Sequence, residues 1–490
     1  MALADQLTIA HGTPGTVLMA AAGRAVAQSV AVRWARRPVL VLAGPGKNGG
    51  DGYVAARLLA DRGWPVTVAA LGDPDRLTGD AAWARGGWGG PIRPVDQVDV
   101  PTGGLVIDAL FGAGLTRALD GSAAKILQAV RAAAVPVVAV DVPSGVHGDT
   151  GAAWGPVCPA TVTVTFFRLK PGHLLLPGRT LCGDRVLADI GMNPSVLSQV
   201  APKGARAHPS LWQSTWPHPP AVDAHKYHRG HGAVWAGATM AGAARLAAMA
   251  ARRIGLGLVT VLAAPAVRAE ITSTAPGLMV KDAAAWDAFI EDPRRTVVVI
   301  GPGGGTGDEI RAAVLRALAA GKNAVLDADA LTAFAPDPDT LFDAIVPSAG
   351  TVILTPHVGE FARLFGAGDV DRVGADRVGP DRLGVVRDAA RRSGAIVLLK
   401  GPDTVVAAPD GRAVINVGAP ARLATAGSGD VLAGMIAGLI GQGMPGLEAA
   451  AAAAWLHGQA AQTIPDGLIA EDLIEAIPAV LPRARSSAMV

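Results

Sequence analysis

The chain contains very little cysteine. Only two of its 490 residues are cysteines, Cys158 and Cys182, and no CxxC pair is present. Two cysteines cannot build a disulfide framework, and the spacing typical of a structural zinc site is missing. We therefore expect a protein of a reducing, cytoplasmic setting.

Long uninterrupted apolar runs and a signal-peptide pattern are also missing. Asp5 interrupts the N-terminus early, and no basic segment followed by an apolar core precedes it. The most apolar windows contain glycine, Gln442 or Glu448 before they reach the length needed to span a membrane. We expect no membrane partner.

Charge is scarce as well. Charged residues make up 17% of the chain, the formal net charge is +2, and no run of Lys or Arg stands out. A nucleic-acid-binding surface normally needs such a cluster, so we expect no nucleic-acid partner. Half of the residues are hydrophobic, which is typical of a globular chain, and 490 residues suffice for two to four domains.

Short β-branched runs alternate with alanine-rich helical stretches throughout the chain. Strands are expected at 39–43, 66–71, 105–109, 137–141 and 161–167, and then at 233–236, 259–263, 297–300, 324–327, 351–354 and 396–400. Helices are expected at 53–61, 123–133, 241–254, 308–320 and 431–440. This alternation predicts an α/β fold, with parallel sheets covered by helices on both faces.

A proline-rich stretch with little periodicity separates the two halves. Six prolines fall between Asn193 and Gly232, and such a composition favours a linker. We therefore predict two α/β domains, at 1–215 and 216–490. The tryptophans Trp83, Trp88, Trp212 and Trp216 are expected in loops or the linker, as docking surface.

A glycine-rich turn follows the first strand. Gly44, Gly46 and Gly49 satisfy GxGxxG, the dinucleotide-binding fingerprint, although this pattern alone is weak. An NAD-dependent oxidoreductase would also need an acid at the end of the second strand, where Asp73 comes only after a glycine. Asn48 and Asp51 are unusual in such a turn and suggest contacts to a ligand or an ion.

Two later strand ends in the first half also carry oxygen-bearing side chains. Asp108 lies near the end of one expected strand and Ser144 follows the next, and the carboxyl ends of parallel strands converge on one crevice. Together with Asn48 they would supply hard oxygen ligands, which suit an alkali or alkaline-earth cation better than zinc. Each residue taken singly is more simply explained as a loop or cap residue.

Three segments of the first half, GPGKNGGDG (44–52), DALFGAGL (108–115) and DVPSGVHGDTG (141–151), resemble the signature segments of the NAD(P)H-hydrate epimerase family, the YjeF N-terminal domain. The resemblance covers about residues 15–195 and implies a Rossmann-like, three-layer α/β/α domain. It also implies K⁺ ligands at Asn48, Asp108 and Ser144, and acid/base chemistry by Asp141 at C6 of the hydrated nicotinamide ring. The implied substrate contacts are Lys47, Asn48, Gly49, Gly50, Asp51, Gly112, Ala113, Gly114, Leu115, Thr116, Arg117, Ala118 and Asp141. Lys47 stands where that family usually has an asparagine.

In the second half, a small-residue loop runs into an apolar helix at Gly427-Ser-Gly-Asp430. Backbone N–H groups at such a helix start can bind an anion, and Asp430 could accept a proton from a substrate hydroxyl. The alternative is that Asp430 simply caps the helix. Further glycine turns, acids and Lys400 at strand ends favour phosphoryl transfer, and the absence of GxxxxGK[ST] excludes a P-loop enzyme.

The segments DADALT (327–332), LTPHVGE (354–360) and ATAGSGD (424–430) resemble the NAD(P)H-hydrate dehydratase branch of the ribokinase superfamily. The resemblance spans about residues 222–485 and implies a ribokinase-like α/β domain that uses ADP or ATP with Mg²⁺. It implies Asp430 as the base. The implied hydrated-cofactor contacts are Ala243, Gly303, His357 and Asp430, and the implied adenine-nucleotide contacts are Lys400, Gly401, Pro402, Asp403, Thr404 and Gly429.

Two histidine features allow simpler explanations. His357 could cap or brace a proline turn instead of contacting a ligand. Five histidines between His208 and His231 suggest a metal site, but no cysteine accompanies them, so we do not favour it.

Together the motifs predict a bifunctional repair enzyme for damaged nicotinamide cofactors. The first domain would interconvert the R and S hydrates NADHX and NADPHX, and the second would dehydrate the S form with ADP or ATP. Two rivals remain: a vitamin or sugar kinase with an accessory nucleotide-binding domain, and a nucleotide sensor that has lost its chemistry. The small apolar faces of such domains also lead us to expect a homo-oligomer.

Overall fold

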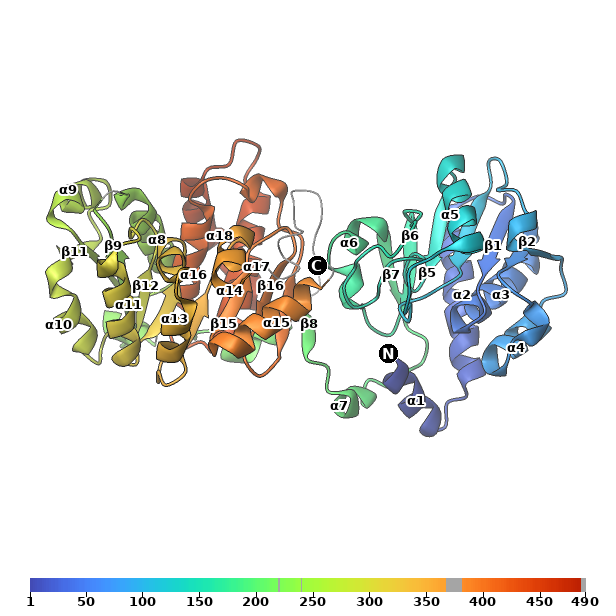
Figure 1. Ribbon diagram of the computed structural model, residues 1–490, viewed down its shortest axis with the longest axis horizontal. Coiled ribbons are helices and arrows are strands. Elements are labelled where there is room, and N and C mark those ends of the chain that lie inside the picture. Colours follow the sequence, from blue (N-terminus) through green and yellow to red (C-terminus); the bar gives the residue numbers. More distant parts are fainter. Residues whose placement is uncertain (219–220, 239, 367–380, 486–490) are drawn as a thin grey trace. The chain divides into compact units, whose positions relative to one another are not determined.

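The computed structural model describes residues 1–218, 221–238, 240–366 and 381–485, and it divides into two compact units. Unit 1 comprises Met1–Pro202 and unit 2 comprises Lys203–Val490. Each unit is built around its own sheet (Figure 1).

The sheet of unit 1 has seven parallel strands in the order β3-β2-β1-β4-β5-β6-β7. Because β1 pairs with β2 on one side and β4 on the other, the chain reverses its direction of winding between β1 and β4. The carboxyl ends of the two strands at such a reversal form the usual ligand crevice of an open α/β sheet. The strands are β1 (Val39–Ala43), β2 (Val66–Ala70), β3 (Ile92–Pro94), β4 (Leu105–Ala109), β5 (Val137–Val140), β6 (Val162–Phe166) and β7 (Asp184–Ala188).

Apolar helices cover this sheet on both faces. The α-helices are α1 (Ala2–Ala10), α2 (Gly15–Arg33), α3 (Lys47–Ala60), α4 (Gly79–Gly86), α5 (Gly121–Ala133), α6 (Gly178–Leu181) and α7 (Val196–Val200). One apolar core contains residues of α2 and α3 with side chains from β1 and β4, and a second contains residues of α5. The central strands β1, β4, β5 and β6 are buried along their whole length, which is characteristic of a parallel sheet covered on both faces.

Helix α2 departs from the expectation that no segment is long and apolar enough to cross a membrane. By length and composition it passes that test. In the structure, Leu18, Met19, Val26 and Val30 are buried in the core of unit 1. A buried core helix can pass the same test as a membrane span.

The sheet of unit 2 has ten strands in the order β11-β10-β9-β12-β13-β14-β15-β16-β17-β8. It is parallel except where β16 pairs with β15 and with β17. Its reversal point lies between β9 and β12. The strands are β8 (Gly204–Arg206), β9 (His231–Ala236), β10 (Leu258–Ala263), β11 (Met279–Asp282), β12 (Val297–Ile300), β13 (Asn323–Leu326), β14 (Val352–Leu354), β15 (Ile396–Leu399), β16 (Thr404–Ala407) and β17 (Ala413–Asn416).

Helices again lie on both faces of this sheet (Figure 1). On one face, α16 contacts α8 and α17, and α18 contacts α8 and α17. All four helices contribute residues to one large core. Helices α11 and α15 contact β12, β13, β15 and β16. The α-helices are α8 (Ala241–Arg253), α9 (Pro265–Thr274), α10 (Trp286–Glu291), α11 (Asp308–Ala319), α12 (Asp329–Phe334), α13 (Pro338–Ile345), α14 (Val358–Phe365), α15 (Arg382–Ser393), α16 (Ser428–Gly441), α17 (Gly446–Thr463) and α18 (Ala470–Arg485).

Every strand expected from the sequence is present to within two residues. The strands that were not expected, namely β3, β7, β8, β11, β16 and β17, are at or near sheet edges. Several of them are partly exposed and carry charged residues, which weakens the apolar pattern that identifies a strand.

Within the stretch expected to be a linker, the residues from Lys203 to Trp216 are part of the fold of unit 2. The structure divides the chain at Pro202 and Lys203, earlier than the expected position near residue 215, because β8 pairs with β17 and thereby belongs to unit 2. Trp212 and Trp216 are buried in the core of unit 2, so their interpretation as docking surface is wrong. Trp88 is buried too, and only Trp83 of the four is exposed.

Candidate active sites

The candidate site of unit 1 lies where β1 and β4 end. Gly44 and Gly49 let the turn after β1 pack tightly: a Cβ atom at Gly44 would lie 1.8 Å from the Leu110 carbonyl oxygen, and one at Gly49 would lie 2.0 Å from the Gly44 carbonyl oxygen. Gly46 has open space instead and forms the N-cap of α3. The turn therefore presents the start of α3 to the crevice, where a ligand can approach the backbone.

Asp108 and Ser144 are in direct contact, as expected of residues at neighbouring strand ends. The Ser144 hydroxyl donates to Asp108 Oδ1 over 2.6 Å, and the Ser144 N–H donates to Oδ2 over 2.8 Å. Burial raises the pKa of Asp108, although the hydrogen bonds from Ser144 and Leu110 oppose the shift. A fully buried carboxylate with these neutral partners is the kind of group that a bound cation would stabilise.

Asn48 is the third residue of this predicted set. Its Oδ1 atom lies near Gly112, where a Cβ would be 3.0 Å from Asn48 Oδ1 and equally far from Asp141 Oδ2. Its Nδ2 atom is buried without a hydrogen-bond partner. Asn48 therefore faces the Gly112 turn and Asp141, with hydrogen-bonding capacity left for a ligand.

Asp141 follows β5 directly and is held by several groups. Its Oδ1 atom lies 2.6 Å from the Lys170 ammonium nitrogen and accepts a 3.0 Å hydrogen bond from Thr165, while Oδ2 accepts one of 2.9 Å from the Ala113 N–H. Its backbone has a positive φ of 67°, which is unusual for a residue other than glycine. Burial opposes ionisation, but the charge and hydrogen bond of Lys170 together hold the pKa of Asp141 below its usual value.

Asp51, on α3, has the opposite tendency. It is buried, and burial together with the negative charge of Asp141 raises its pKa well above the usual range. Two carboxyl groups with pKa values displaced in opposite directions are typical of sites that perform acid/base chemistry.

The remaining predicted contacts of unit 1 surround these groups unevenly. Gly49 and Gly50 are buried in α3. Lys47 is exposed at the start of this helix, and its Nζ atom lies 3.6 Å from Asp5 Oδ2. In the loop after β4, Leu115 is buried and Gly114, Thr116, Arg117 and Ala118 are exposed.

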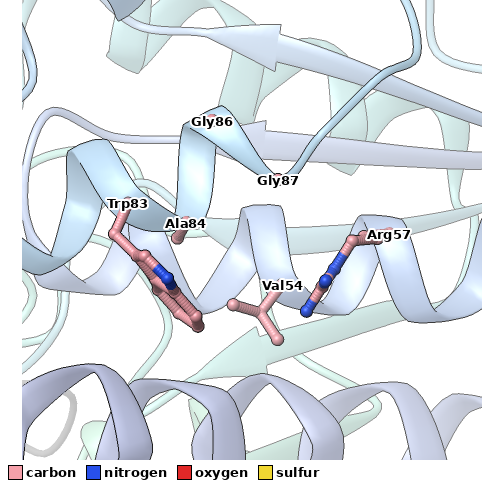
Figure 2. A pocket seen from close by; sticks show the side chains of 6 residues that line it. All are labelled: Val54, Arg57, Trp83, Ala84, Gly86 and Gly87. Atoms are coloured by element: carbon pink, nitrogen blue, oxygen red, sulfur yellow. The ribbon is translucent and has the colours of Figure 1, made fainter.

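A surface pocket of about 410 Å³ lies elsewhere in unit 1, between α3 and α4 (Figure 2). Its lining residues are Val54, Arg57, Trp83, Ala84, Gly86 and Gly87. They include no acid and no residue predicted to bind the substrate, so we do not assign this pocket to the candidate site.

The candidate site of unit 2 lies at the ends of β9 and β12. The loop after β12 contains Gly303, with φ of 62°, where a Cβ would lie 2.3 Å from the Met240 carbonyl oxygen, just before α8. Ala243 belongs to the first turn of α8. Gly303 and Ala243, which were predicted to contact the same ligand, are thus placed together. Farther along the loop, the Gly305 N–H donates to Asp329 Oδ2 over 2.9 Å.

Asp430 lies in the first turn of α16 but does not cap it. The N-cap is Gly427, in the left-handed region with φ of 82°, and no side chain caps this helix. Burial, and then the negative charge of Asp327, raises the pKa of Asp430 to about 7. A carboxyl group with a pKa near 7 can act as a general base at neutral pH.

Lys400, at the end of β15, provides positive charge beside Asp430. Its Nζ atom lies 2.7 Å from Asp327 Oδ1 and 3.9 Å from Glu360 Oε2. A Cβ at Gly429 would be 3.3 Å from the same Nζ atom, which places the first turn of α16 against this ammonium group. Burial lowers the pKa of Lys400, but Asp327 and Glu360 overcome that effect and raise it, so the residue remains charged.

His357 adopts the simpler role considered above, as the N-cap of α14. Its Nδ1 atom accepts from the Gly359 and Glu360 N–H groups, while Glu360 accepts from the His357 N–H, which completes a capping box. The side chain is still 55% exposed. Capping through Nδ1 therefore leaves the Nε2 edge, which is 3.4 Å from Glu360, available to a ligand.

The turn from Lys400 to Thr404 is fixed from behind by Arg382 of α15. The buried guanidinium donates to the carbonyl oxygens of Asp403 and Lys400, each over 3.0 Å. Asp403, which was predicted to contact the nucleotide, has a fully buried side chain whose Oδ1 lies 3.5 Å from Arg382 Nε. The whole residue is buried, so in this structure neither its side chain nor its backbone presents a surface to a ligand.

Several site residues had received no role from the sequence. Lys170 comes shortly after β6. The only local feature that could have pointed to it is its place at the start of a Lys-Pro-Gly turn. Asp327, Asp329 and Glu360 lie inside motifs that the sequence had singled out. His457 of α17 hydrogen-bonds to the backbone of Ser428, and burial lowers its pKa to about 4, so its ring is neutral.

The described residues include no group of three or more His, Cys, Asp or Glu side chains that could hold a metal ion. Three of the five histidines that suggested a metal make other contacts: the rings of His225 and His228 are centred 3.6 Å apart, and His231 hydrogen-bonds to Thr260.

Each unit of the chain matches a known protein family. Residues 233–481 match the family described as NAD(P)H-hydrate dehydratase, and residues 15–172 match the family described as YjeF-related protein N-terminus. Three relatives are called bifunctional NAD(P)H-hydrate repair enzyme. That of Moorella thermoacetica is 36% identical over 96% of this chain and 92% of its own length, that of Mycobacterium tuberculosis is 40% identical over 85% and 81%, and that of Escherichia coli is 35% identical over 90% and 84%.

Among solved structures, the chain is similar to the ADP/ATP-dependent NAD(P)H-hydrate dehydratase of Bacillus subtilis co-crystallised with ATP/Mg²⁺. The TM-score is 0.50 at 28% identity, and the match covers 57% of this chain and 98% of that one. Because the curated relatives extend across both units at this level of identity, the chain belongs to the family of bifunctional NAD(P)H-hydrate repair enzymes.

Proposed function

We propose that this chain restores hydrated NADH and NADPH, with one reaction in each unit. Unit 1 interconverts the R and S epimers at C6 of the hydrated ring, and unit 2 converts the S hydrate back to NAD(P)H with ADP or ATP. Membership of the family and the presence of both sets of motifs support this assignment over a kinase with an accessory domain.

The observation that carries the dehydratase assignment is the buried Asp430, with its raised pKa, in the first turn of α16. As the base, Asp430 takes the proton of the C6 hydroxyl while the hydroxyl oxygen attacks the terminal phosphoryl group of the nucleotide. The N1 lone pair then expels phosphate from C6, and loss of a proton from C5 restores the C5=C6 double bond. The pKa of about 7 makes Asp430 available in its ionised form near neutral pH.

The groups around Asp430 divide into two predicted sets. Ala243, Gly303 and His357 contact the hydrated cofactor, while the turn from Lys400 to Thr404, with Gly429, contacts the nucleotide. Lys400 supplies positive charge, and the N–H groups at the start of α16 face the transferring phosphoryl group.

Mg²⁺ accompanies the nucleotide in this proposal and neutralises phosphate charge when bound. Asp327, Asp329 and Glu360 add negative charge near Asp430 but form no metal-binding group among the described residues, so Mg²⁺ would be held mainly by the nucleotide phosphates.

In unit 1, Asp141 serves as the acid/base group at C6. Asn48, Asp108 and Ser144 would hold K⁺, which supplies positive charge near the bound substrate. The buried Asp108 carboxylate with its neutral hydrogen-bond donors fits a monovalent cation, because one positive charge balances one carboxylate.

One experiment tests both reactions. The purified chain is incubated with an equimolar mixture of the R and S epimers of the NADH hydrate and with ADP or ATP, and the absorbance band of NADH is followed. Recovery of all the NADH supports both activities, whereas recovery of half would remove the epimerase assignment. Accumulation of a phosphorylated product without NADH would support the kinase alternative instead.

A further inference from the structure

Lys170 is a buried lysine beside the proposed acid/base group of unit 1. Its side chain is only 7% exposed, and its ammonium group contacts three oxygen atoms. These are Asp141 Oδ1 at 2.6 Å, Thr165 Oγ1 at 2.8 Å and the Phe166 carbonyl oxygen at 3.2 Å. An ammonium group can donate three hydrogen bonds, so these contacts use its full capacity.

The backbone on both sides of this contact is fixed by His173. Its Nδ1 atom accepts from the Lys170 N–H over 2.9 Å, so Nε2 carries the proton and donates to the Asp141 carbonyl oxygen over 2.7 Å. One neutral ring thus joins the turn that carries Lys170 to the strand end that carries Asp141. Burial lowers the pKa of His173, which favours this neutral form.

The arrangement is costly for a purely structural contact. Burying an ion pair costs desolvation energy, and an apolar pair of similar volume often stabilises a fold as well. Asp141 also has a positive φ, which costs further energy. Costs that converge on one residue in a crevice are characteristic of functional sites.

The geometry determines which part of Asp141 faces the crevice. Lys170 and Thr165 hold Oδ1 from the β6 side, so Oδ2 is directed to the loop after β4, where it accepts from Ala113 and lies near the Gly112 position and Asn48. That loop and Asn48 belong to the predicted substrate contacts.

We propose that Lys170 is a positioning residue of the epimerisation site, which holds one oxygen of Asp141 so that the other faces C6 of the substrate. This inference rests on the proposed epimerase function of unit 1. Thr165 supports the same geometry by donating to the Asp141 side chain, and His173 supports it by donating to the Asp141 backbone carbonyl.

The test uses Lys170→Met and Lys170→Arg in the full chain, with Lys125→Met as the matched control. Lys125 is exposed on α5, so its replacement removes one lysine from the same unit without touching the site. Each variant receives the pure R hydrate of NADH with ADP, and the S hydrate in a separate reaction. Conversion of the R hydrate beyond the spontaneous rate requires unit 1, whereas the S hydrate reports on unit 2 alone.

We expect Lys170→Met to lower kcat for the R hydrate by about 10²-fold, the lower end of the range for a disabled acid/base group, with KM changed by less than about threefold. Lys170→Arg keeps the charge and should recover part of that loss. Lys125→Met should behave as the unmodified chain, and all variants should convert the S hydrate at the unmodified rate.

A double-mutant cycle with Asp141→Asn covers the case in which Lys170→Met alone disturbs folding. The double variant removes both charges of the pair, so no buried charge is left without its partner. If Lys170 acts through Asp141, Lys170→Met should cost nothing further in the Asp141→Asn background. Independent, multiplicative losses would contradict the inference, as would an unchanged kcat for Lys170→Met.

Failure of the proposed function would look different. If the unmodified chain does not accelerate conversion of the R hydrate, unit 1 is not an epimerase. If it does so and Lys170→Met has no effect, only the role of Lys170 is wrong.

Discussion

At the scale of single residues, environment separates acids of the same chemical type. Asp141 is held ionised by an adjacent lysine, while Asp430 is largely desolvated among other carboxylates and titrates near neutrality. Asp403 is turned inward to Arg382 and has no free face for a ligand. The role of an acid in these sites therefore depends on its neighbours more than on its place in a motif.

Replacement of Asp430 tests its role as the base. Asp430→Asn preserves the shape of the side chain but cannot accept the proton, so we expect dehydration of the S hydrate to slow by about 10²- to 10⁴-fold. Epimerisation should continue, which is measured as equilibration of a pure R hydrate with the S form. Asp388→Asn, at an exposed position of α15, is the matched control and should retain both activities. Full dehydration by Asp430→Asn would mean that another group is the base.

The pKa of Asp430 predicts the pH dependence of the same reaction. A base must be unprotonated, so kcat/KM for the S hydrate should rise with pH and level off above about 7, the pKa in the free enzyme. The measurement is the initial rate at low concentrations of S hydrate between about pH 5.5 and 9, at saturating ADP. A flat profile over this range would show that no group with such a pKa controls the step.

At the scale of elements, α16 carries Asp430 and depends on very close packing against α8. Glycines at two positions of α16 allow this approach: a Cβ at Gly434 would lie 2.1 Å from the Ala247 carbonyl oxygen, and one at Gly438 would lie 2.2 Å from the Ile254 side chain. The alanine-rich face of α8 is the other half of the contact. Small residues on both helices thereby set the position of the first turn, which carries Asp430.

Gly434→Ala tests this packing. The added methyl group meets backbone, which cannot rotate away, so we expect unit 2 to lose about 1–3 kcal/mol of unfolding free energy. Denaturant unfolding measures the loss. Gly242→Ala in α8 is the control, because a Cβ there has nothing within 4 Å, and alanine should be neutral or stabilising by up to about 1 kcal/mol. Equal stabilities of the two variants would contradict the close packing.

At the scale of the whole molecule, the two sites belong to units with separate sheets and separate cores. Each unit has its own winding reversal and its own crevice at the carboxyl ends of its strands. The chemistry requires only that the S hydrate made by unit 1 reaches unit 2, and free diffusion suffices for that.

A mixing experiment tests this independence. Asp141→Asn and Asp430→Asn chains should each fail to convert pure R hydrate to NADH efficiently, because one lacks epimerisation and the other lacks dehydration. An equimolar mixture should restore the conversion, since the S hydrate can move between chains. The readout is the NADH absorbance band. No restoration, although each variant keeps its other activity, would show that the intermediate does not leave its chain.

The sequence by itself determined the α/β class and the central strands, and it predicted the segments that carry the candidate sites. Central strands of a parallel sheet are continuous apolar runs, and glycine-rich turns with acids follow them directly, so both are visible locally. The edge strand β7 escaped because its residues are partly exposed and include charged ones, which weakens the apolar pattern of a strand. The proline-rich stretch was misjudged because burial of Trp212 depends on contacts distant in the sequence.

Only the tertiary structure decided how the site residues are paired and charged. Lys170 meets Asp141, and Lys400 meets Asp327, across separate strand ends, and neither contact leaves a pattern in the local sequence. The charge and hydrogen bond of Lys170 together outweigh burial and lower the pKa of Asp141, whereas burial and the charge of Asp327 raise the pKa of Asp430. The physical reason is that desolvation and Coulomb interactions depend on distance in space, which the chain fixes only when its strands have been assembled into sheets.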